Sequence, residues 1–307
     1  MKTKIKLIIN PVAGNGSVKK KWSHVRRIAS NLFKEISWDF TKKPADAIQL
    51  TRKAIHEGYE TIVAVGGDGT IHEVVNGFFE NGEPIHSDAV LGMISMGTGC
   101  DLAKSLELPH SLHTAMAKIK NHRCCKFDVG KLTYTKNNGK NGVCFFINIA
   151  DAGFGGAMVE VVNQSSKALG QFVAYVSALL RTLATYKNKS IHIKIDDIFE
   201  AELTVNSVVV ANGQFFGGGM WIAPKAVMND GLFDITIIGD VTRRDVLAQL
   251  HKLYNGTLHT HPKVQTFRGK TVTLTSKHLV KLDADGEAAG VLPAYFEILP
   301  AALNVII

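Results

Sequence analysis

The sequence lacks any apolar run of the ~18 residues that a membrane-spanning helix requires. Its longest candidate, Phe172–Tyr186, is interrupted by Arg181 and is expected to be a buried or amphipathic helix. The apolar run before Asn10 is too short for the core of a signal peptide. If the protein meets a membrane, we therefore expect it to do so peripherally.

Cysteine is scarce, with only 4 residues in the chain, and none of them forms a C-x-x-C pair. The adjacent Cys124 and Cys125 would point to opposite faces of a strand, so they cannot easily chelate one metal ion. This pattern favours reduced thiols over a disulfide framework.

Several functional motifs are also missing. No H-x-x-x-H or H-E-x-x-H spacing supports a zinc site, and no G-x-S-x-G supports a hydrolase of that type. Neither a Walker A loop nor a G-x-G-x-x-G after a strand is present. The basic residues are dispersed without interleaved aromatics, which argues against nucleic-acid binding.

What the sequence does have is a surplus of positive charge. Lys and Arg number 35 against 27 Asp and Glu, which gives a formal net charge of +8. This surplus suits an anionic partner such as a nucleotide or a membrane surface, although a solvated basic surface explains it equally well.

The first part of the chain alternates between strand-like and helix-like segments. Strands are predicted at residues 4–10, 36–40, 61–65 and 89–95, each followed by a turn and a helical pattern. This order predicts a doubly wound parallel α/β sheet with helices on both faces. All the turns that follow its strands then lie on one edge, where such sheets bind ligands.

After Arg123 the pattern changes to short alternating strands separated by turn signals, as in Ile191–Ile195. This predicts an antiparallel all-β region with one or two inserted helices. We therefore expect two domains, residues 1–126 with the tail 294–307, and residues 127–293.

The stretch Thr61–Gly77, TIVAVGGDGTIHEVVNG, sets a carboxylate among glycines. Glycines at a strand-to-helix turn expose backbone N–H groups, and the helix that follows favours a phosphate. Asp68 would repel a phosphate unless a cation lies between them, so the pattern indicates Mg²⁺. A tight turn with Asp68 as a helix cap remains an alternative.

Three further turns lie at the same predicted edge. They contribute Asn10, Thr41 and, from MGTGCD, Thr98 and Asp101. Together the four turns predict a nucleotide or phosphate ester bound at the edge of the sheet.

Two acidic stretches occur late in the chain. Asp283, Asp285 and Glu287 alternate, so they share one face if the strand continues through them. They are either a solvated hairpin tip or a site where a carboxylate accepts a proton from an attacking hydroxyl. Asp230, in the turn Asn229–Gly231, either belongs to a simple turn or binds a hard cation.

Taken together, these motifs resemble the bacterial diacylglycerol kinase family of lipid kinases, relatives of the sphingosine and ceramide kinases. The resemblance covers nearly the whole chain and rests on six motifs: NPVAGNG, VAVGGDGTIHEVVNG, MGTGCDLAKSL, INIADAGFGG, NGQFFGGGMWIAPKAVMNDGLFDI and DADGE with EILPAAL. Their order and spacing are more specific than GGDGT alone, which NAD kinases share.

The resemblance implies an α/β domain and a C-terminal β-sandwich, with ATP and Mg²⁺ in the cleft between them. The catalytic carboxylate is then Glu287 or Asp285. A structural Mg²⁺ site falls on Asp230 and the carbonyls of Val227 and Leu232. The positions matching the family's nucleotide site are Asn10, Thr41, Gly66, Gly67, Asp68, Gly69, Thr70, His72, Glu73, Thr98 and Asp101.

The implied activity is ATP- and Mg²⁺-dependent phosphorylation of a lipid hydroxyl at a membrane surface, with diacylglycerol as the default acceptor. The resemblance thus implies a cytoplasmic protein that is peripheral to the inner face of the membrane. One departure is Cys100, where the family usually has asparagine. It keeps open a non-catalytic nucleotide- or lipid-binding relative, and NAD kinase is the other alternative. The oligomeric state stays open, with a homodimer as one option.

Overall fold

The computed structural model describes residues 4–97, 99–108, 111–164 and 171–307. The chain divides into two compact units. Unit 1 comprises residues 1–129 and 300–307, and unit 2 comprises residues 130–299.

Unit 1 is built on a parallel sheet. Its strands β1 (Ile5–Ile9), β2 (Ile36–Phe40), β3 (Thr61–Gly66) and β6 (Val90–Ser95) lie in the order β6-β3-β1-β2, and every pair among them is parallel. All residues of β1 and β3 are buried. Apolar strands of this kind need cover on both faces, so the structure confirms the predicted α/β sheet.

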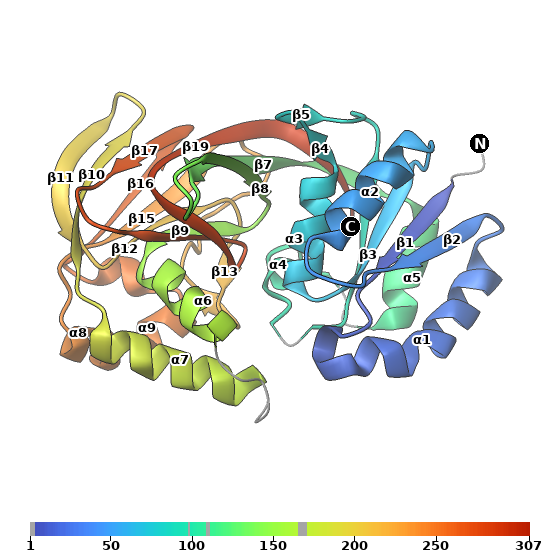
Figure 1. Cartoon of the computed structure of the whole chain (residues 1–307), viewed down its shortest axis with the longest axis horizontal. Coiled ribbons are helices and arrows are strands. Elements are labelled where there is room, and N and C mark those ends of the chain that lie inside the picture. Colours follow the sequence, from blue (N-terminus) through green and yellow to red (C-terminus); the bar gives the residue numbers. More distant parts are fainter. Residues whose placement is uncertain (1–3, 98, 109–110, 165–170) are drawn as a thin grey trace. The chain divides into compact units, whose positions relative to one another are not determined.

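Two pairs of helices supply that cover (Figure 1). Helix α1 (Ala13–Leu32) packs with α5 (Leu112–Asn121), and α2 (Asp46–His56) packs with α3 (Asp68–Gly77). The buried residues of α1 recur at helical spacing and join one core with β1 and β3. The short helix α4 (Asp101–Ser105) and the small hairpin of β4 (Phe79–Glu80) and β5 (Glu83–Pro84) complete the unit.

The tail of the chain belongs to the same sheet. Strand β19 (Glu287–Ile306) ends beside β6 in parallel, with Asn304 opposite Val90 and Val305 opposite Leu91. The backbone N–H of Ala301 donates to Oδ1 of the buried Asp128 at 2.7 Å.

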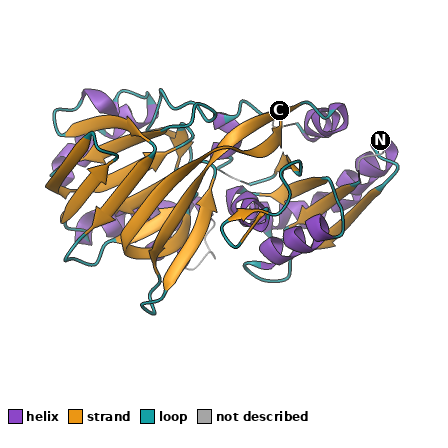
Figure 2. Ribbon diagram, turned by 90° about the horizontal axis from the view of Figure 1, so that it is seen from above, coloured by secondary structure: helices purple, strands orange, loops and turns teal. Residues whose placement is uncertain are grey.

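Unit 2 is mainly antiparallel β structure, as Figure 2 shows. Its pairs include β9 with β12 and β18, β12 with β15, β15 with β16, and β10 with β11 and β17. The strands are β7 (Cys124–Thr135), which begins in unit 1, β8 (Asn141–Phe146), β9 (Ile149–Gly153), β10 (Lys189–Ile195), β11 (Phe199–Val205), β12 (Ser207–Ala211), β13 (Phe215–Phe216), β14 (Met220–Trp221), β15 (Phe233–Ile238), β16 (Val264–Gly269), β17 (Thr271–Thr275), β18 (Lys281–Ala284) and the first part of β19.

One apolar core lies within this β-sandwich. It joins residues of β9, β12, β15 and β18 to residues of β10, β17 and β19, with the rings of Phe146 and Phe233 stacked 5.6 Å apart. The fold of the second half is therefore the antiparallel sandwich that the sequence predicts.

Helices are inserted between the strands of unit 2. They are α6 (Phe154–Gln164), α7 (Gln171–Thr185), α8 (Arg243–Ala248), α9 (Leu250–Tyr254) and the 3₁₀ turn η2 (Leu258–Thr260). Helix α7 confirms the helix predicted near residues 172–186. Within the described part of the chain, no helix combines the length and apolar character needed to cross a bilayer.

Candidate active site

Three turns meet at the carboxyl ends of β1, β3 and β6 in unit 1. The Asn10 side chain, just after β1, donates from Nδ2 to Thr70 Oγ1 at 3.0 Å, and its backbone N–H donates to the Val65 carbonyl. The stretch Gly66–Thr70 forms the β3–α3 turn and the first turn of α3. The edge of the sheet therefore gathers the small polar groups that the sequence predicted there.

Two of these turns approach each other so closely that only backbone atoms fit between them. A Cβ atom built on Gly97 would lie 2.7 Å from the Gly67 Cα atom, which is too close for any side chain. Glycine is thus required here because two backbones approach each other directly.

Asp68 and Asp101 come together beside these glycines. The Asp101 N–H lies 3.4 Å from Asp68 Oδ2, and Lys104 Nζ lies 3.3 Å from Asp101 Oδ1. Burial raises the pKa of Asp68 above its usual value, and the Asp101 carboxylate raises it further. Within the described residues, Asp68 Oδ1 is buried and has no hydrogen-bond partner.

An unpartnered buried carboxylate oxygen is costly unless something binds it. Carboxylate oxygens are the ligands that Mg²⁺ prefers, and the buried Asp101 and the half-buried Asp68 lie together at one edge of the sheet. These residues therefore fit a divalent cation that is bound together with phosphate.

The remaining predicted residues of this edge have varied surroundings. The Thr41 N–H donates to the Ile9 carbonyl, which ties the turn after β2 to β1. Glu73 accepts the Ala45 and Ala47 N–H groups at 2.8 and 3.1 Å, so it supports the start of α2. His72 lies one position before Glu73, and its carbonyl accepts from Asn76 Nδ2. Thr98 lies outside the described residues.

Cys100 precedes α4 in a left-handed conformation, with φ of 52°. Its thiol donates to the Gly97 carbonyl at 3.3 Å. Burial, with the nearby Asp68 charge, raises the pKa of this thiol, so it stays protonated.

In unit 2, the structure decides whether the strand continues through the late acids. The strand does not continue through them, because β18 ends at Ala284 and Asp285–Gly286 form a two-residue turn with positive φ at both positions. The three acids therefore do not share a face. Asp283 is buried, and Glu287 is exposed at the start of β19.

Asp285 is fully engaged by backbone donors. Its carboxylate oxygens accept the N–H groups of Ile147, Asn148 and Ile149 at 3.1, 2.9 and 3.1 Å. These contacts hold the β18–β19 turn against the start of β9.

The residues predicted for a structural metal site lie before β15. Asp230 Oδ1 accepts the Leu232 N–H at 3.1 Å, and its other oxygen pairs with the Arg268 guanidinium. Arg268 also pairs with Asp234 at 3.3 Å. Val227 precedes this turn. Since a guanidinium already neutralises Asp230, the arrangement does not fit a divalent ion at the same carboxylate.

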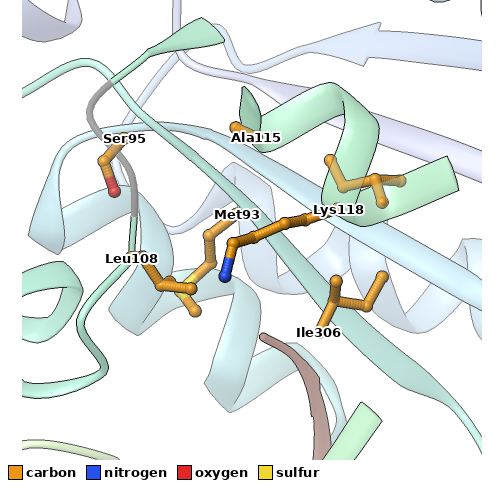
Figure 3. A pocket seen from close by; sticks show the side chains of 7 residues that line it. Met93, Ser95, Leu108, Ala115, Lys118 and Ile306 are labelled. Carbon is orange, nitrogen blue, oxygen red and sulfur yellow. The ribbon is translucent and has the colours of Figure 1, made fainter. Parts of the chain in front are cut away.

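Two cavities lie away from these residues. The cavity drawn in Figure 3, in unit 1, encloses about 10 Å³ between Met93, Leu108 and Lys118, which is room for one water at most. A hollow of about 220 Å³ in unit 2 is lined by Phe154, Tyr186 and other residues. None of the predicted site residues that the structure describes lines either cavity.

One buried acid was not singled out from the sequence. Asp151, in β9, is 2% exposed and lies opposite Asp283 of β18. The available signal was an acidic residue inside the apolar stretch INIADAGFGG.

The chain therefore combines two units: an α/β unit that carries the GGDGT turn at one edge of its sheet, and a β-sandwich unit. Comparison with known families agrees. The diacylglycerol kinase catalytic domain matches residues 4–132, and the YegS C-terminal NAD kinase beta sandwich-like domain matches residues 148–307.

Relatives align along the whole chain. It is 30% identical to the diacylglycerol kinase of Staphylococcus carnosus (strain TM300) over 99% of this chain and 95% of that protein. It is 29% identical to the diacylglycerol kinase of Staphylococcus aureus (strain MRSA252), over 99% and 92%. The chain therefore belongs to the diacylglycerol kinase catalytic domain family, which is a family of kinases.

Solved structures share the fold. A diacylglycerol kinase from Bacillus anthracis str. Sterne superimposes with a TM-score of 0.71 at 20% identity, over 99% of this chain and 96% of that one. Yeast NADH kinase complexed with NADH superimposes with a TM-score of 0.53 at 12% identity, over 99% and 83%. The fold is thus shared with both kinds of kinase.

Proposed function

We propose that the protein is an ATP- and Mg²⁺-dependent lipid kinase that transfers the γ-phosphoryl group to a lipid hydroxyl, with diacylglycerol as the default acceptor. The observation that carries this proposal is the buried, unpartnered Asp68 oxygen beside the bare Gly67–Gly97 backbone. A carboxylate there needs a cation, and the exposed backbone suits phosphate oxygens. Family membership supplies the reaction class.

Unit 1 holds the nucleotide in this proposal. The N–H groups at the start of α3 and the positive end of its dipole attract phosphate oxygens. Asp68 and Asp101 would hold Mg²⁺, and the bound ion would supply positive charge that offsets the negative charge of the nucleotide phosphates. Asn10 fixes the Thr70 hydroxyl at the same edge, so the site is ordered before the nucleotide binds.

Glu287 is the better candidate for the proton acceptor. Asp285 uses its oxygens to accept three backbone N–H groups, which is a structural task. Glu287 follows Gly286 at the start of β19, and its side chain is exposed. As the lipid oxygen bonds to the γ-phosphorus and the bond from that phosphorus to ADP breaks, the hydroxyl proton passes to the Glu287 carboxylate.

Action on a lipid implies work at a membrane surface, and the net charge of +8 fits an anionic, cytoplasmic face. The aromatic rings of Phe154 and Trp221 pack within unit 2, against Tyr186 and Phe215 respectively.

The test is phosphate transfer from labelled ATP with Mg²⁺ onto a panel of lipids in anionic mixed micelles, with NAD as a soluble acceptor in parallel. Asp68→Ala and Glu287→Gln should each lower the rate by about 10²-fold or more. Asp197→Asn is the matched control, since Asp197 is an exposed acid in the β10–β11 turn and should leave the rate unchanged.

Each result decides between the candidates. Transfer to one lipid, lost in both variants, supports the kinase and names its acceptor. Transfer to NAD alone would make the protein an NAD kinase. ATP binding without transfer to any acceptor would indicate a non-catalytic relative.

A further inference from the structure

Two buried carboxylates lie opposite each other on neighbouring strands, close to the turn that precedes Glu287. Asp151 of β9 and Asp283 of β18 are direct partners across an antiparallel pair of strands. Their exposed fractions are 2% and 5%. Residues that are directly opposite in such a pair have Cβ atoms about 4.5–5.5 Å apart on the same face of the sheet, so the two side chains are neighbours.

Neutral donors surround both groups. Asp151 Oδ1 accepts the N–H groups of Gly155 and Gly156 at 3.0 and 3.3 Å and the Ser207 hydroxyl at 3.3 Å. Asp283 Oδ2 accepts the Gly286 N–H at 3.3 Å. None of these donors carries a charge that could neutralise the carboxylates.

Among the residues that the structure describes, the other ionisable groups of the neighbouring elements do not supply a cation either. The nearest basic side chain on β18 is Lys281, whose Nζ lies 3.0 Å from Glu160 Oε1 of α6. The remaining described groups that act on the pair or on its neighbour Asp285 are acids or neutral: Asp285 and Glu287 in the β18–β19 turn, Tyr186 after α7 and Cys144 of β8.

Two carboxylates in this position cannot both be ionised at low cost. Burial disfavours each charge, and like charges directly opposite on a sheet repel. In agreement, burial raises the pKa of Asp151 to about 7. Burial, and then the Asp151 charge, raises the pKa of Asp283 well above its usual value.

We propose that Asp151 and Asp283 share one proton at neutral pH and act as positioning residues for the turn that carries Glu287. The pair then holds one proton and a charge of −1, and loss of that proton leaves −2. The first half of the inference concerns the folded protein alone, and the second half rests on the proposed function.

The link to the turn is direct. Asp283 accepts the N–H of Gly286, which lies between Asp285 and Glu287, and Ala284 is paired with Glu287. A second charge on the pair would add repulsion toward Asp285 and Glu287 within one hairpin. With its proton in place, the pair leaves the turn intact and leaves Glu287 as an acceptor.

The sign of the effect on stability follows from linkage. The folded protein holds the shared proton more tightly than the unfolded chain, in which an aspartate titrates near pH ~3.9. The resulting stabilisation is complete below that pH and is lost as the pH rises through about 7, where the folded pair titrates.

The first experiment measures Tm from about pH 5 to about pH 9 for the wild type, Asp151→Asn, Asp283→Asn and the double variant. An asparagine oxygen can still accept the N–H groups, so each single variant keeps the local hydrogen bonds. Relative to the wild type, the Tm of each single variant should rise by roughly 5–10 °C between about pH 5 and about pH 8. The shifts in the double variant should not add, because the two residues share the proton.

Asp128→Asn is the matched control, since Asp128 is a buried aspartate of unit 1 that accepts a backbone N–H. It should show no comparable dependence on pH. A pH-independent Tm difference for Asp151→Asn and Asp283→Asn, or strict additivity in the double variant, would overturn the shared proton.

A measurement on the wild type covers the case in which the variants do not fold. The infrared carbonyl band of a buried carboxylic acid, sensitive to D₂O, should be present near pH 6 and absent near pH 9. If no such band is seen near pH 6, the pair does not hold a proton and the proposal fails.

The role in positioning is tested by the pH profile of phosphate transfer. In the wild type, kcat should fall on the alkaline side as the pair loses its proton, and in Asp283→Asn that fall should move to higher pH or vanish. An unmoved profile would contradict the positioning role. If neither protein transfers phosphate, the proposed function fails, while the Tm and infrared results still decide the shared proton.

Discussion

Cys100 shows how one residue can be poorly matched to its backbone. It stands in a left-handed conformation at the start of α4, and its side chain makes no capping hydrogen bond. Asparagine adopts this conformation far more readily and is a good N-cap residue. The thiol also lies near Asp68, so this position borders the proposed nucleotide site.

We predict that Cys100→Asn stabilises the protein by roughly 0.5–1 kcal/mol, measured by urea unfolding, because asparagine relieves the conformational strain. The same variant should transfer phosphate faster, since an amide is a stronger hydrogen-bond partner than a thiol. Cys100→Ser is the control, because serine has a similar size without the same preference for positive φ. A loss of stability in Cys100→Asn would show that the buried site cannot accept the amide.

At the scale of elements, the hairpin between β18 and β19 assigns different tasks to two neighbouring acids. Asp285 joins the turn to the backbone of residues 147–149, and Glu287 is exposed beside it. The D-G turn itself was readable from the sequence, because positive φ at two successive positions favours these residues. The three contacts of Asp285 were not, because they join residues 136 to 138 positions apart.

Asp285→Asn should destabilise the protein by about 2 kcal/mol, because one of its two acceptor oxygens becomes a donor that faces backbone N–H groups. Glu287→Gln should leave the free energy of unfolding nearly unchanged while it lowers the rate of phosphate transfer by about 10²-fold or more. Urea unfolding and the transfer assay on both variants separate the two tasks. The assignment of the proton acceptor would be reversed if Asp285→Asn were fully stable and inactive.

The difference between local patterns and contacts of distant residues also explains which other features could be predicted from the sequence. Strand, turn and helix order in unit 1 follows from local patterns, and so does the convergence of Asn10, Asp68 and Asp101, because parallel strands end at one edge. The pairing of Asp151 with Asp283 depends on the register of two strands that are distant in sequence, which no local pattern encodes. The Arg268 contact with Asp230 has the same origin.

At the scale of the whole molecule, the surplus of positive charge bears on where the protein acts. The net charge of +8 is spread along the chain and is not confined to one motif. Long-range attraction of this kind is screened by salt, whereas apolar contacts are not.

We predict that binding to vesicles that contain phosphatidylglycerol weakens by about tenfold or more when the salt concentration rises from about 0.05 M to about 0.5 M. Co-sedimentation measures the bound fraction, and vesicles of phosphatidylcholine alone are the control, which should bind weakly at every salt concentration. Equal binding to both kinds of vesicle, independent of salt, would rule out an electrostatic contribution.

Strand β19 has a consequence for synthesis in the cell. Its end pairs with β6, yet residues 300–307 leave the ribosome only after all of unit 2 has been made. The side chain of Asn304 donates to the carbonyl of Ser87, which lies more than 200 residues earlier in the chain. The edge of β6 therefore stays unpaired while the residues between them are synthesised. Unit 1 therefore cannot complete its sheet until unit 2 has been synthesised, and until then the nascent chain exposes a sheet edge to which chaperones can bind.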